Sequence, residues 1–154
     1  MHNNRIHIRS YNRTDKPRVM GLLRLNTPMY FSPHEERDLV YYLDHEIEEY
    51  YVLEVDDEVV GCGGINYKEN HTVAYISWDF LHPDWQRQGY GRMLLGFRLD
   101  KLNDDKTVAQ IIVRTSQFVY RFYEKSGFRL VRRLDDYWAK GYDLYQMEYV
   151  KEYG

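Results

Sequence analysis

The 154-residue chain contains one cysteine, Cys62, and no cluster of cysteine and histidine that could hold zinc. A single cysteine excludes an intramolecular disulfide, so the cysteine usage is typical of a reducing compartment. No apolar run approaches the roughly 18 residues of a membrane-spanning helix, and the first residues lack the pattern of a secretory signal. We therefore expect a cytoplasmic protein that binds no metal and no membrane.

The chain also has no basic excess. Its 21 lysine and arginine residues are outnumbered by 24 aspartate and glutamate residues, which gives a formal net charge of −3 at pH 7. Proteins whose main partner is nucleic acid usually carry a strongly basic surface. We therefore expect no nucleic acid among the partners of this protein.

No internal repeat, low-complexity stretch or flexible linker divides the chain, so we expect a single domain over residues 1–154. Hydrophobic periodicity, helix caps and turn residues predict the element order β-α-α-β-β-β-α-β-α-β-β. This order predicts an α/β (α+β) fold with a central, mostly antiparallel mixed sheet of about six to seven strands and about four helices. The predicted strands cover residues 6–10, 50–55, 59–65, 72–81, 108–113, 128–131 and 142–150.

The start of the second helix has a pattern of its own. In Ser32-Pro33-His34-Glu35-Glu36, serine stands at the N-cap, proline at the first helical position and glutamate at the third. This arrangement is typical of a capping box, in which the N-cap and the third residue satisfy each other's backbone N–H groups. We therefore expect the helix to begin directly after Ser32.

The segment Gln86-Arg87-Gln88-Gly89-Tyr90-Gly91-Arg92 lies between a predicted strand and a predicted helix. Its two glycines allow a tight turn and close approach of a ligand, while the first N–H groups of the helix and two arginines favour an anion. A pyrophosphate would fit this cradle. The chain has no Walker sequence, and the third glycine of a dinucleotide fingerprint is absent, so those two phosphate-binding folds are excluded.

These residues resemble the signature of the GNAT family of N-acetyltransferases, Gln/Arg-x-x-Gly-x-Gly/Ala, which follows a strand as it does here. A second similarity lies about 30 residues later in Phe122-Tyr123-Glu124-Lys125-Ser126-Gly127-Phe128, which is similar to a Tyr-Glu-Lys-x-Gly-Phe run of the family. The element order agrees as well, so the resemblance covers essentially the whole chain. It implies a GNAT-like fold, acetyl-CoA as the donor and an amine as the acceptor.

The resemblance also implies roles for individual residues. The loop that would hold the pyrophosphate comprises Arg87, Gln88, Gly89, Tyr90, Gly91 and Arg92, and the end of the preceding strand, Phe80 and Leu81, would pair with the pantetheine arm. Tyr123 matches the general acid that protonates the leaving sulfur. Either Ser116 or Gln117 occupies the place of a pantetheine-binding asparagine, since the two ways of aligning the chain differ by one residue.

The general base of the family has no direct counterpart. Where many relatives have a glutamate, this chain has Tyr75, and the strand 108–113 offers only Gln110. Asp79 is the nearest acidic substitute and is our candidate base, with an ordered water as the alternative. The acidic stretch 46–49 could attract a cationic amine, although a solvated helix face explains it equally simply.

The acceptor remains open at the level of the sequence. Residues 136–147 are similar to a segment that holds the peptide in protein N-terminal acetyltransferases, although Trp138 and Leu144 depart from its pattern. We expect a small amine or amino compound as the acceptor, with a peptide N-terminus as the alternative. A non-catalytic acyl-CoA-binding regulatory domain is an alternative to the enzyme itself, and for either function a homodimer is among the expected states. With 16 tyrosines, the commonest residue, the composition favours an aromatic, hydroxyl-lined acceptor cleft that includes Tyr75, Tyr137 and Trp138.

Overall fold

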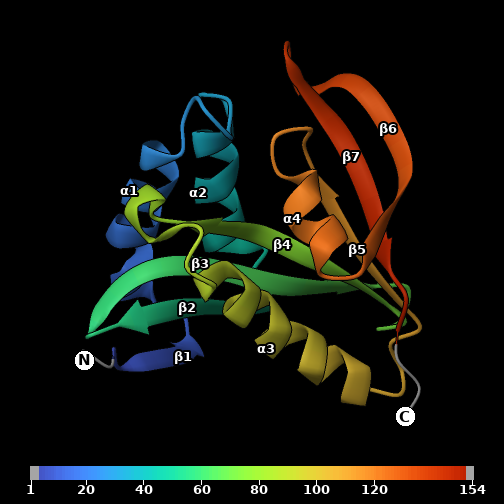
Figure 1. Cartoon of the computed structure of the whole chain (residues 1–154), viewed down its shortest axis with the longest axis horizontal. Helices are drawn as coiled ribbons and strands as arrows, with labels where there is room; N and C mark the ends of the chain where they lie inside the picture. Colours follow the sequence, from blue (N-terminus) through green and yellow to red (C-terminus); the bar gives the residue numbers. More distant parts are fainter. Residues whose placement is uncertain (1–3, 152–154) are drawn as a thin grey trace.

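A computed structural model describes residues 4–151 as one α/β domain (Figure 1). The predicted element order is confirmed, with two short 3-10 helices added. The strands are β1 (Ile6–Ser10), β2 (Glu49–Val55), β3 (Glu58–Lys68), β4 (Val73–Leu81), β5 (Gln110–Thr115), β6 (Phe128–Ala139) and β7 (Tyr142–Tyr149). The helices are η1 (Arg13–Asp15), α1 (Lys16–Leu25), α2 (Glu35–His45), η2 (Pro83–Trp85), α3 (Tyr90–Asp104) and α4 (Tyr120–Lys125).

The strands form one seven-stranded sheet in the order β1-β2-β3-β4-β5-β7-β6. Within residues 4–151, β4 and β5 are the one parallel pair, and the other neighbours are antiparallel, so the predicted mixed and mostly antiparallel sheet is confirmed. In Figure 1 the helices α1 and α2 stand on one side of the molecule and the β6–β7 pair rises on the other.

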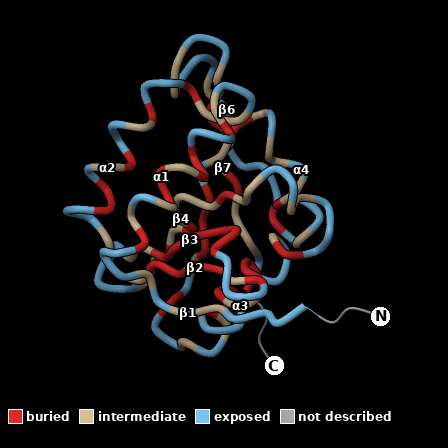
Figure 2. The backbone as a smooth tube through the Cα atoms, turned by 90° about the vertical axis from the view of Figure 1, so that its left-hand side faces the viewer, coloured by how far each residue is buried: buried red, intermediate tan, exposed pale blue. Residues whose placement is uncertain are grey.

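Helices cover both faces of the central strands. On β2, Tyr50 and Val52 pack with α1 and α2, whereas the alternate residues Tyr51 and Leu53 pack with α3. Successive side chains of a strand point to opposite faces, so burial of both faces requires the nearly continuous apolar run that the sequence contains. Figure 2 shows the buried residues concentrated along β2, β3 and β4.

The sheet opens at its centre. β4 and β5 are paired from Val73 to Ile76 and from Gln110 to Val113, and the ladder stops there although both strands continue. At the same level the register between β3 and β4 shifts, and Trp78 has a φ of 47°, a left-handed conformation that is unusual for a bulky residue. The bulge and the interrupted ladder leave residues 77–81 without a strand partner on the β5 side, among the residues that the structure describes.

Several strand ends differ from the prediction by one to three residues, as in β3, which continues to Lys68, and two further differences have a structural reason. The strand predicted at 128–131 continues to Ala139, because an edge strand with both faces exposed needs no apolar alternation. The second helix begins at Glu35 rather than directly after Ser32. Half of the predicted capping box is present: the Glu35 carboxylate accepts from the Ser32 N–H at 2.8 Å, but the Ser32 hydroxyl accepts from the His34 N–H at 3.2 Å.

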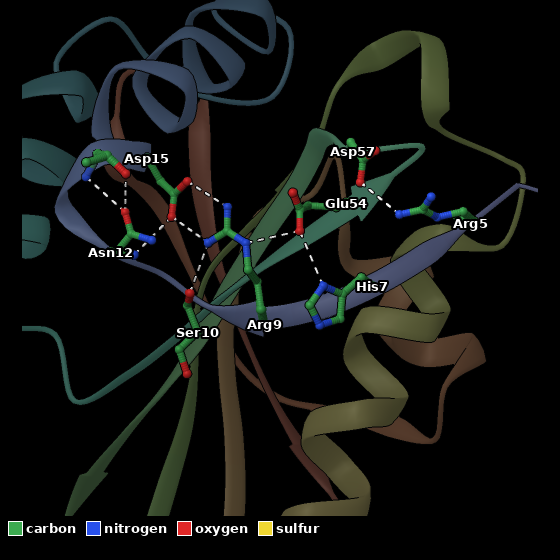
Figure 3. A network of polar contacts seen from close by, with 9 residues as sticks. Arg5, His7, Arg9, Ser10, Asn12, Asp15, Glu54 and Asp57 are labelled. Carbon is green, nitrogen blue, oxygen red and sulfur yellow. Dashed lines mark hydrogen bonds and ion pairs between the residues drawn. The ribbon is translucent and has the colours of Figure 1, made fainter.

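A polar network ties the first strand to the first helix (Figure 3). Arg9 donates to both carboxylate oxygens of Asp15, at 2.8 and 2.9 Å, and to Glu54 at 3.0 Å. Asp15 also accepts from the backbone N–H of Asn12 at 2.9 Å. Charge-assisted and bidentate bonds of this kind are the strong ones in proteins, so the network fixes the N-terminal edge of the sheet.

Candidate active site

A cavity of about 1010 Å³ opens where β4 and β5 diverge. Its wall is built from the loop between α1 and α2, the ends of β3, β4 and β5, the loop before α3, the segment around α4 and the β6–β7 pair. Residues that are far apart in the sequence therefore meet around one space. The predicted site residues that line it are Tyr75, Asp79, Phe80, Leu81, Arg87, Gly89, Gly91, Arg92, Ser116, Tyr123 and Trp138.

The glycines of the loop before α3 are needed for its shape. Gly89 occupies the N-cap of α3 with a φ of 91°, and a Cβ added at Gly91 would lie 3.2 Å from side-chain atoms of Leu81 and Phe122. The first backbone N–H groups of an α-helix have no partner within the helix. A glycine-lined loop at a helix N-terminus therefore presents N–H groups to the cavity, where an anion could bind.

Two loop residues direct their side chains elsewhere. Gln88 donates from Nε2 to the carbonyl of Asp84 at 3.0 Å, and the buried Tyr90 accepts from Asn4 at 2.8 Å. The Tyr90 ring packs edge-to-face on Trp85. Neither side chain lines the cavity, so these two positions can contribute only backbone groups to a ligand.

Asn26 bonds both Leu81 and Gln86 and thereby holds the loop before α3 against the end of α1. This residue was not identified from the sequence. This buried side chain at the end of α1 donates to the carbonyls of Leu22 and Leu81, each at 2.8 Å, and accepts from Gln86 Nε2 at 3.1 Å. Gln86 is the first residue of the signature. A polar residue after a helix is common, so no local signal distinguishes Asn26 before the chain folds.

Tyr123 and Asp79 meet at the centre of the cavity wall. The Tyr123 hydroxyl donates to Asp79 Oδ2 at 3.0 Å, and Arg98 Nη2 donates to the same oxygen at 2.8 Å. Tyr123 is 3% exposed, and burial together with the neighbouring carboxylate raises its pKa well above the ordinary value for tyrosine. The phenol is therefore protonated at neutral pH, as a general acid must be before it acts.

The sequence prediction left the choice between Ser116 and Gln117 open, and the geometry favours Ser116. Ser116 is buried and lines the cavity. Gln117 instead bonds the β6–β7 turn, donating to the carbonyl of Gly141 and accepting from the N–H of Asp143, each at 2.8 Å.

Aromatic side chains form the other end of the cavity. Trp78 stacks on Phe31 with a centroid distance of 6.2 Å and an interplanar angle of 18°, and Tyr42 lies 6.2 Å away on a different side. The Tyr142 hydroxyl donates to the carbonyl of Pro28 at 2.7 Å, which joins β7 to the loop between α1 and α2. Tyr137 does not line the cavity: it is exposed and accepts from Arg114.

Three carboxylates besides Asp79 line the cavity. Glu46 and Glu48 belong to the acidic stretch 46–49, and Glu35 was assigned from the sequence only to a helix cap. Glu35 is 8% exposed, and burial raises its pKa to about 7 against the opposing effect of the Ser32 N–H. Within residues 4–151, no lysine, arginine or histidine forms an ion pair with it.

The described chain offers no group of three histidine, cysteine, aspartate or glutamate residues that could hold a metal ion. None of the helices found between residues 4 and 151 is long and apolar enough to cross a membrane.

Comparisons with known proteins agree on one family. Residues 30–151 match the acetyltransferase (GNAT) domain family. The amino-acid acetyltransferase of Pasteurella multocida (strain Pm70) is 26% identical over 93 residues, which are 60% of this chain and 21% of that protein. The chain thus spans about a fifth of the length of the curated relatives it matches.

Solved structures agree in fold. The ribosomal-protein-S18-alanine N-acetyltransferase of Escherichia coli has a TM-score of 0.78 and 19% identity, covering 97% of this chain and 96% of that one. The spermidine N-acetyltransferase of Vibrio cholerae, solved with CoA and spermine, has a TM-score of 0.72 and 18% identity, covering 95% of each chain. Because the domain match extends over most of the sequence, this chain belongs to the GNAT acetyltransferase family.

Proposed function

We propose that the protein is an N-acetyltransferase that moves the acetyl group of acetyl-CoA to a primary amine by direct attack. One observation carries the proposal: a single cavity contains both a glycine loop at a helix N-terminus and the protonated phenol of Tyr123. The first can bind a pyrophosphate, and the second can protonate a leaving sulfur.

The residues present fit acetyl-CoA. The loop positions Arg87, Gly89, Gly91 and Arg92 would hold its pyrophosphate, and the crowding at Gly91 means that any larger residue there would press on Leu81 and Phe122. Within residues 4–151, β4 has no strand partner on the β5 side at Phe80 and Leu81, and its backbone groups other than the Leu81 carbonyl, which accepts from Asn26, would bind an amide-bearing arm as strands bind extended peptides. Ser116 adds a hydroxyl on the opposite wall. When bound, acetyl-CoA supplies the acetyl thioester, whose carbon is open to attack by an amine.

The reaction needs an acid and a base. As the new C–N bond forms and the C–S bond breaks, the electron pair of the broken bond goes to sulfur, and Tyr123 holds a proton at Oη for it. The amine must lose one proton. Asp79 is a poor acceptor for that proton because Arg98 already binds its carboxylate at 2.8 Å.

Glu35 fits the base better than Asp79. Its carboxylate lines the same cavity, has no arginine or lysine partner within residues 4–151, and has a pKa of about 7. A base with a pKa near the working pH is the most effective one. We propose that Glu35, directly or through an ordered water, takes the proton that the nitrogen of the attacking neutral amine loses as the amide forms.

The proposed acceptor is a small amine or amino compound. The bridge from Tyr142 to Pro28 closes the cavity on one side, which favours a small molecule over a folded protein surface. Glu46 and Glu48 on the wall favour a cationic acceptor. The relatives act on amino acids, a ribosomal protein alanine and spermidine, so a peptide N-terminus is the second candidate. A cytoplasmic location and a homodimer stay predictions.

A screen of amine acceptors for release of free CoA tests the proposal. The panel holds polyamines, amino acids, aminoglycosides and peptides with a free N-terminus. We expect turnover with at least one class, and a fall in kcat of about a hundredfold or more for Tyr123→Phe, as for the loss of a general acid. Tight binding of acetyl-CoA in calorimetry without turnover on any amine would instead support a non-catalytic binding domain.

A further inference from the structure

A buried ion pair lies directly beneath the candidate active site. Arg98 from α3 and Asp79 from β4 are joined at 2.8 Å, with the Arg98 side chain 0% exposed and the Asp79 side chain 9% exposed. Apolar residues of similar volume are often as stabilising as a buried ion pair, or more so. Stability alone therefore does not explain why two charges occupy this position.

The surrounding backbone is shaped to admit the guanidinium group. A Cβ added at Gly63 would lie 2.7 to 2.9 Å from Arg98 atoms, a distance that requires one of the two to move. The remaining nitrogens of Arg98 donate to backbone carbonyls, Nη1 to Gly64 and Nε to Leu94, each at 3.2 Å. With all three nitrogens bonded, the guanidinium has one orientation, and the Asp79 carboxylate is held with it.

The same carboxylate oxygen determines where the Tyr123 hydroxyl points. Packing against Phe122 and Phe128, at centroid distances of 5.0 and 5.5 Å, fixes the Tyr123 ring. Ring packing does not set the direction of the O–H bond, since a hydroxyl rotates to suit its partners. The bond of 3.0 Å to Asp79 Oδ2 sets it.

We propose that Arg98 is a positioning residue that holds the Asp79 carboxylate as a fixed acceptor and thereby fixes the place of the Tyr123 hydroxyl oxygen in the cavity wall. The effect of Arg98 on catalysis rests on the proposed function. The effect of Arg98 on the Asp79 carboxylate can be measured whether or not the protein is an acetyltransferase. In this arrangement Asp79 Oδ2 already accepts from two donors, so the amine proton goes to another group. Without Arg98 the same carboxylate would be buried without a cation, and burial raises the pKa of a carboxyl group.

Few other groups could obscure a change at Asp79. The ionisable groups that interact with it are Arg98 on α3, Tyr123 on α4, Tyr50 on β2 and Cys62 on β3. Burial raises the pKa of Tyr50, Cys62 and Tyr123, so all three are neutral below pH 8. Arg98 is therefore the one cation in this set. Glu35 lines the same cavity and has a pKa of about 7, so each variant is also compared with its Glu35→Gln counterpart before a titration between pH 5 and 8 is assigned to Asp79.

The first test needs no acetyl-CoA. The whole chain is labelled with ¹³C at the aspartate carboxyl carbon, and the Asp79 signal is assigned with Asp79→Asn. We expect this signal to stay at the ionised position from pH 5 to 8 in the unsubstituted protein and in Arg98→Lys, but to titrate in Arg98→Gln. Arg129→Gln, at an exposed arginine of β6, is the matched control and behaves as the unsubstituted protein. An Asp79 signal that stays ionised in Arg98→Gln overturns the proposal.

The second test uses the amine found in the acceptor screen. In Arg98→Gln we expect kcat to fall about tenfold to a hundredfold, less than for loss of the acid itself, with the KM for the amine nearly unchanged. The unsubstituted enzyme already has the acid limb of the proposed base Glu35, and Arg98→Gln gains a second acid limb that disappears in Arg98→Gln/Asp79→Asn. A merely structural role would not create a limb that depends on Asp79, so its absence contradicts the proposal.

A second variant covers the case in which Arg98→Gln fails to fold. Gly63→Ala crowds the guanidinium while keeping every charge, so we expect a lower kcat with Asp79 still ionised, and an unchanged kcat overturns the proposal. If the unsubstituted protein releases no CoA on any amine, the proposed function fails, and the carboxyl titration still decides the role of Arg98 toward Asp79.

Discussion

Arg9 and Arg98 both bind carboxylates, but in different surroundings. Arg9 lies in the N-terminal network of Figure 3, with 27% of its side chain exposed, and bonds Asp15 through two nitrogens and Glu54 through the third. Arg98 is fully buried, and only one of its nitrogens reaches a carboxylate, that of Asp79. Arg9 thus bonds carboxylates through all three of its nitrogens, whereas Arg98 bonds one carboxylate oxygen, Asp79 Oδ2, which also accepts from Tyr123.

This difference separates a structural pair from one for which we propose a role in the active site. The Arg9 network lies away from the cavity and connects β1, η1 and β2, so its effect is on folding. The Arg98 pair reaches the cavity wall through Asp79 and Tyr123. Glu35 is a third case, a buried carboxylate that, among the described residues, forms no ion pair. Substitutions in the three settings should therefore differ in size and in pH dependence.

Removing Asp79 should have the largest effect on stability. Asp79→Ala leaves the Arg98 charge buried without a partner, and we expect the free energy of unfolding to fall by about 3 to 5 kcal/mol. Urea unfolding at pH 7 measures it. Asp84→Ala is the matched control, because the Asp84 side chain is 87% exposed. A loss no larger than that of the control would mean that the pair is not effectively buried in solution.

Removing the charge of Glu35 should stabilise the protein at high pH. Because burial raises the folded-state pKa from 4.5 to about 7, the folded protein loses stability as the pH rises through this range. Glu35→Gln lacks this loss, so its free energy of unfolding should exceed that of the unsubstituted protein by about 1 to 3 kcal/mol at pH 8 and by less at pH 5. Thermal or urea unfolding at both pH values gives the difference. Glu36→Gln, next in the chain, should show no such growth with pH.

Breaking the Arg9 network should have a moderate effect with the opposite pH dependence. Arg9 holds the pKa of Asp15 below its usual 3.8, so the stabilisation is present above that value and is lost as the pH falls through the folded-state pKa. We expect Asp15→Asn to lower the free energy of unfolding by about 1 to 2 kcal/mol at pH 7, between the values for exposed and buried pairs. The difference should shrink toward pH 3. A constant difference would assign the effect to packing.

The exposed pair of Arg5 and Asp57 should matter least. Their side chains are 81% and 80% exposed and 3.3 Å apart. Water and salt screen such pairs, so Arg5→Gln should change the free energy of unfolding by less than about 0.5 kcal/mol. A change as large as that of Asp15→Asn would show that the exposure of an arginine does not determine how much its ion pair adds to the free energy of unfolding.

Much of the fold could be predicted because its signals are local. The alternation around residues 50–65, the apolar run at 108–113 and the glycine at 127 each reflect backbone geometry or burial within a few residues. Prediction failed where no local burial pattern exists, as in the exposed half of β6, which is held by pairing with β7 and by hydrogen bonds that join Tyr137 and Trp138 to β5.

The loop that we propose holds the cofactor could also be found from the sequence, since its glycines and the helix start are continuous in the chain. Ser116 and Gln117 could not be separated, because one residue of register decides which side chain faces the cavity and which bonds the β6–β7 turn. The two glycines of Gly63-Gly64 did carry a signal for Arg98, since a glycine inside a strand often marks a close approach of other atoms.

Composition and motifs were thus sufficient to predict one α/β domain and to select Tyr123 and the glycines of the loop before α3, which the fold brings to one cavity. They could not show that Arg98 stands behind Asp79, or that Glu35 lies in the cavity wall with a raised pKa. Both facts depend on contacts between residues far apart in the chain, 19 positions for the ion pair and 44 for the bond from Tyr123 to Asp79. Burial and charge pairing arise only when such segments pack together, so the protonation states that govern the site are properties of the folded chain.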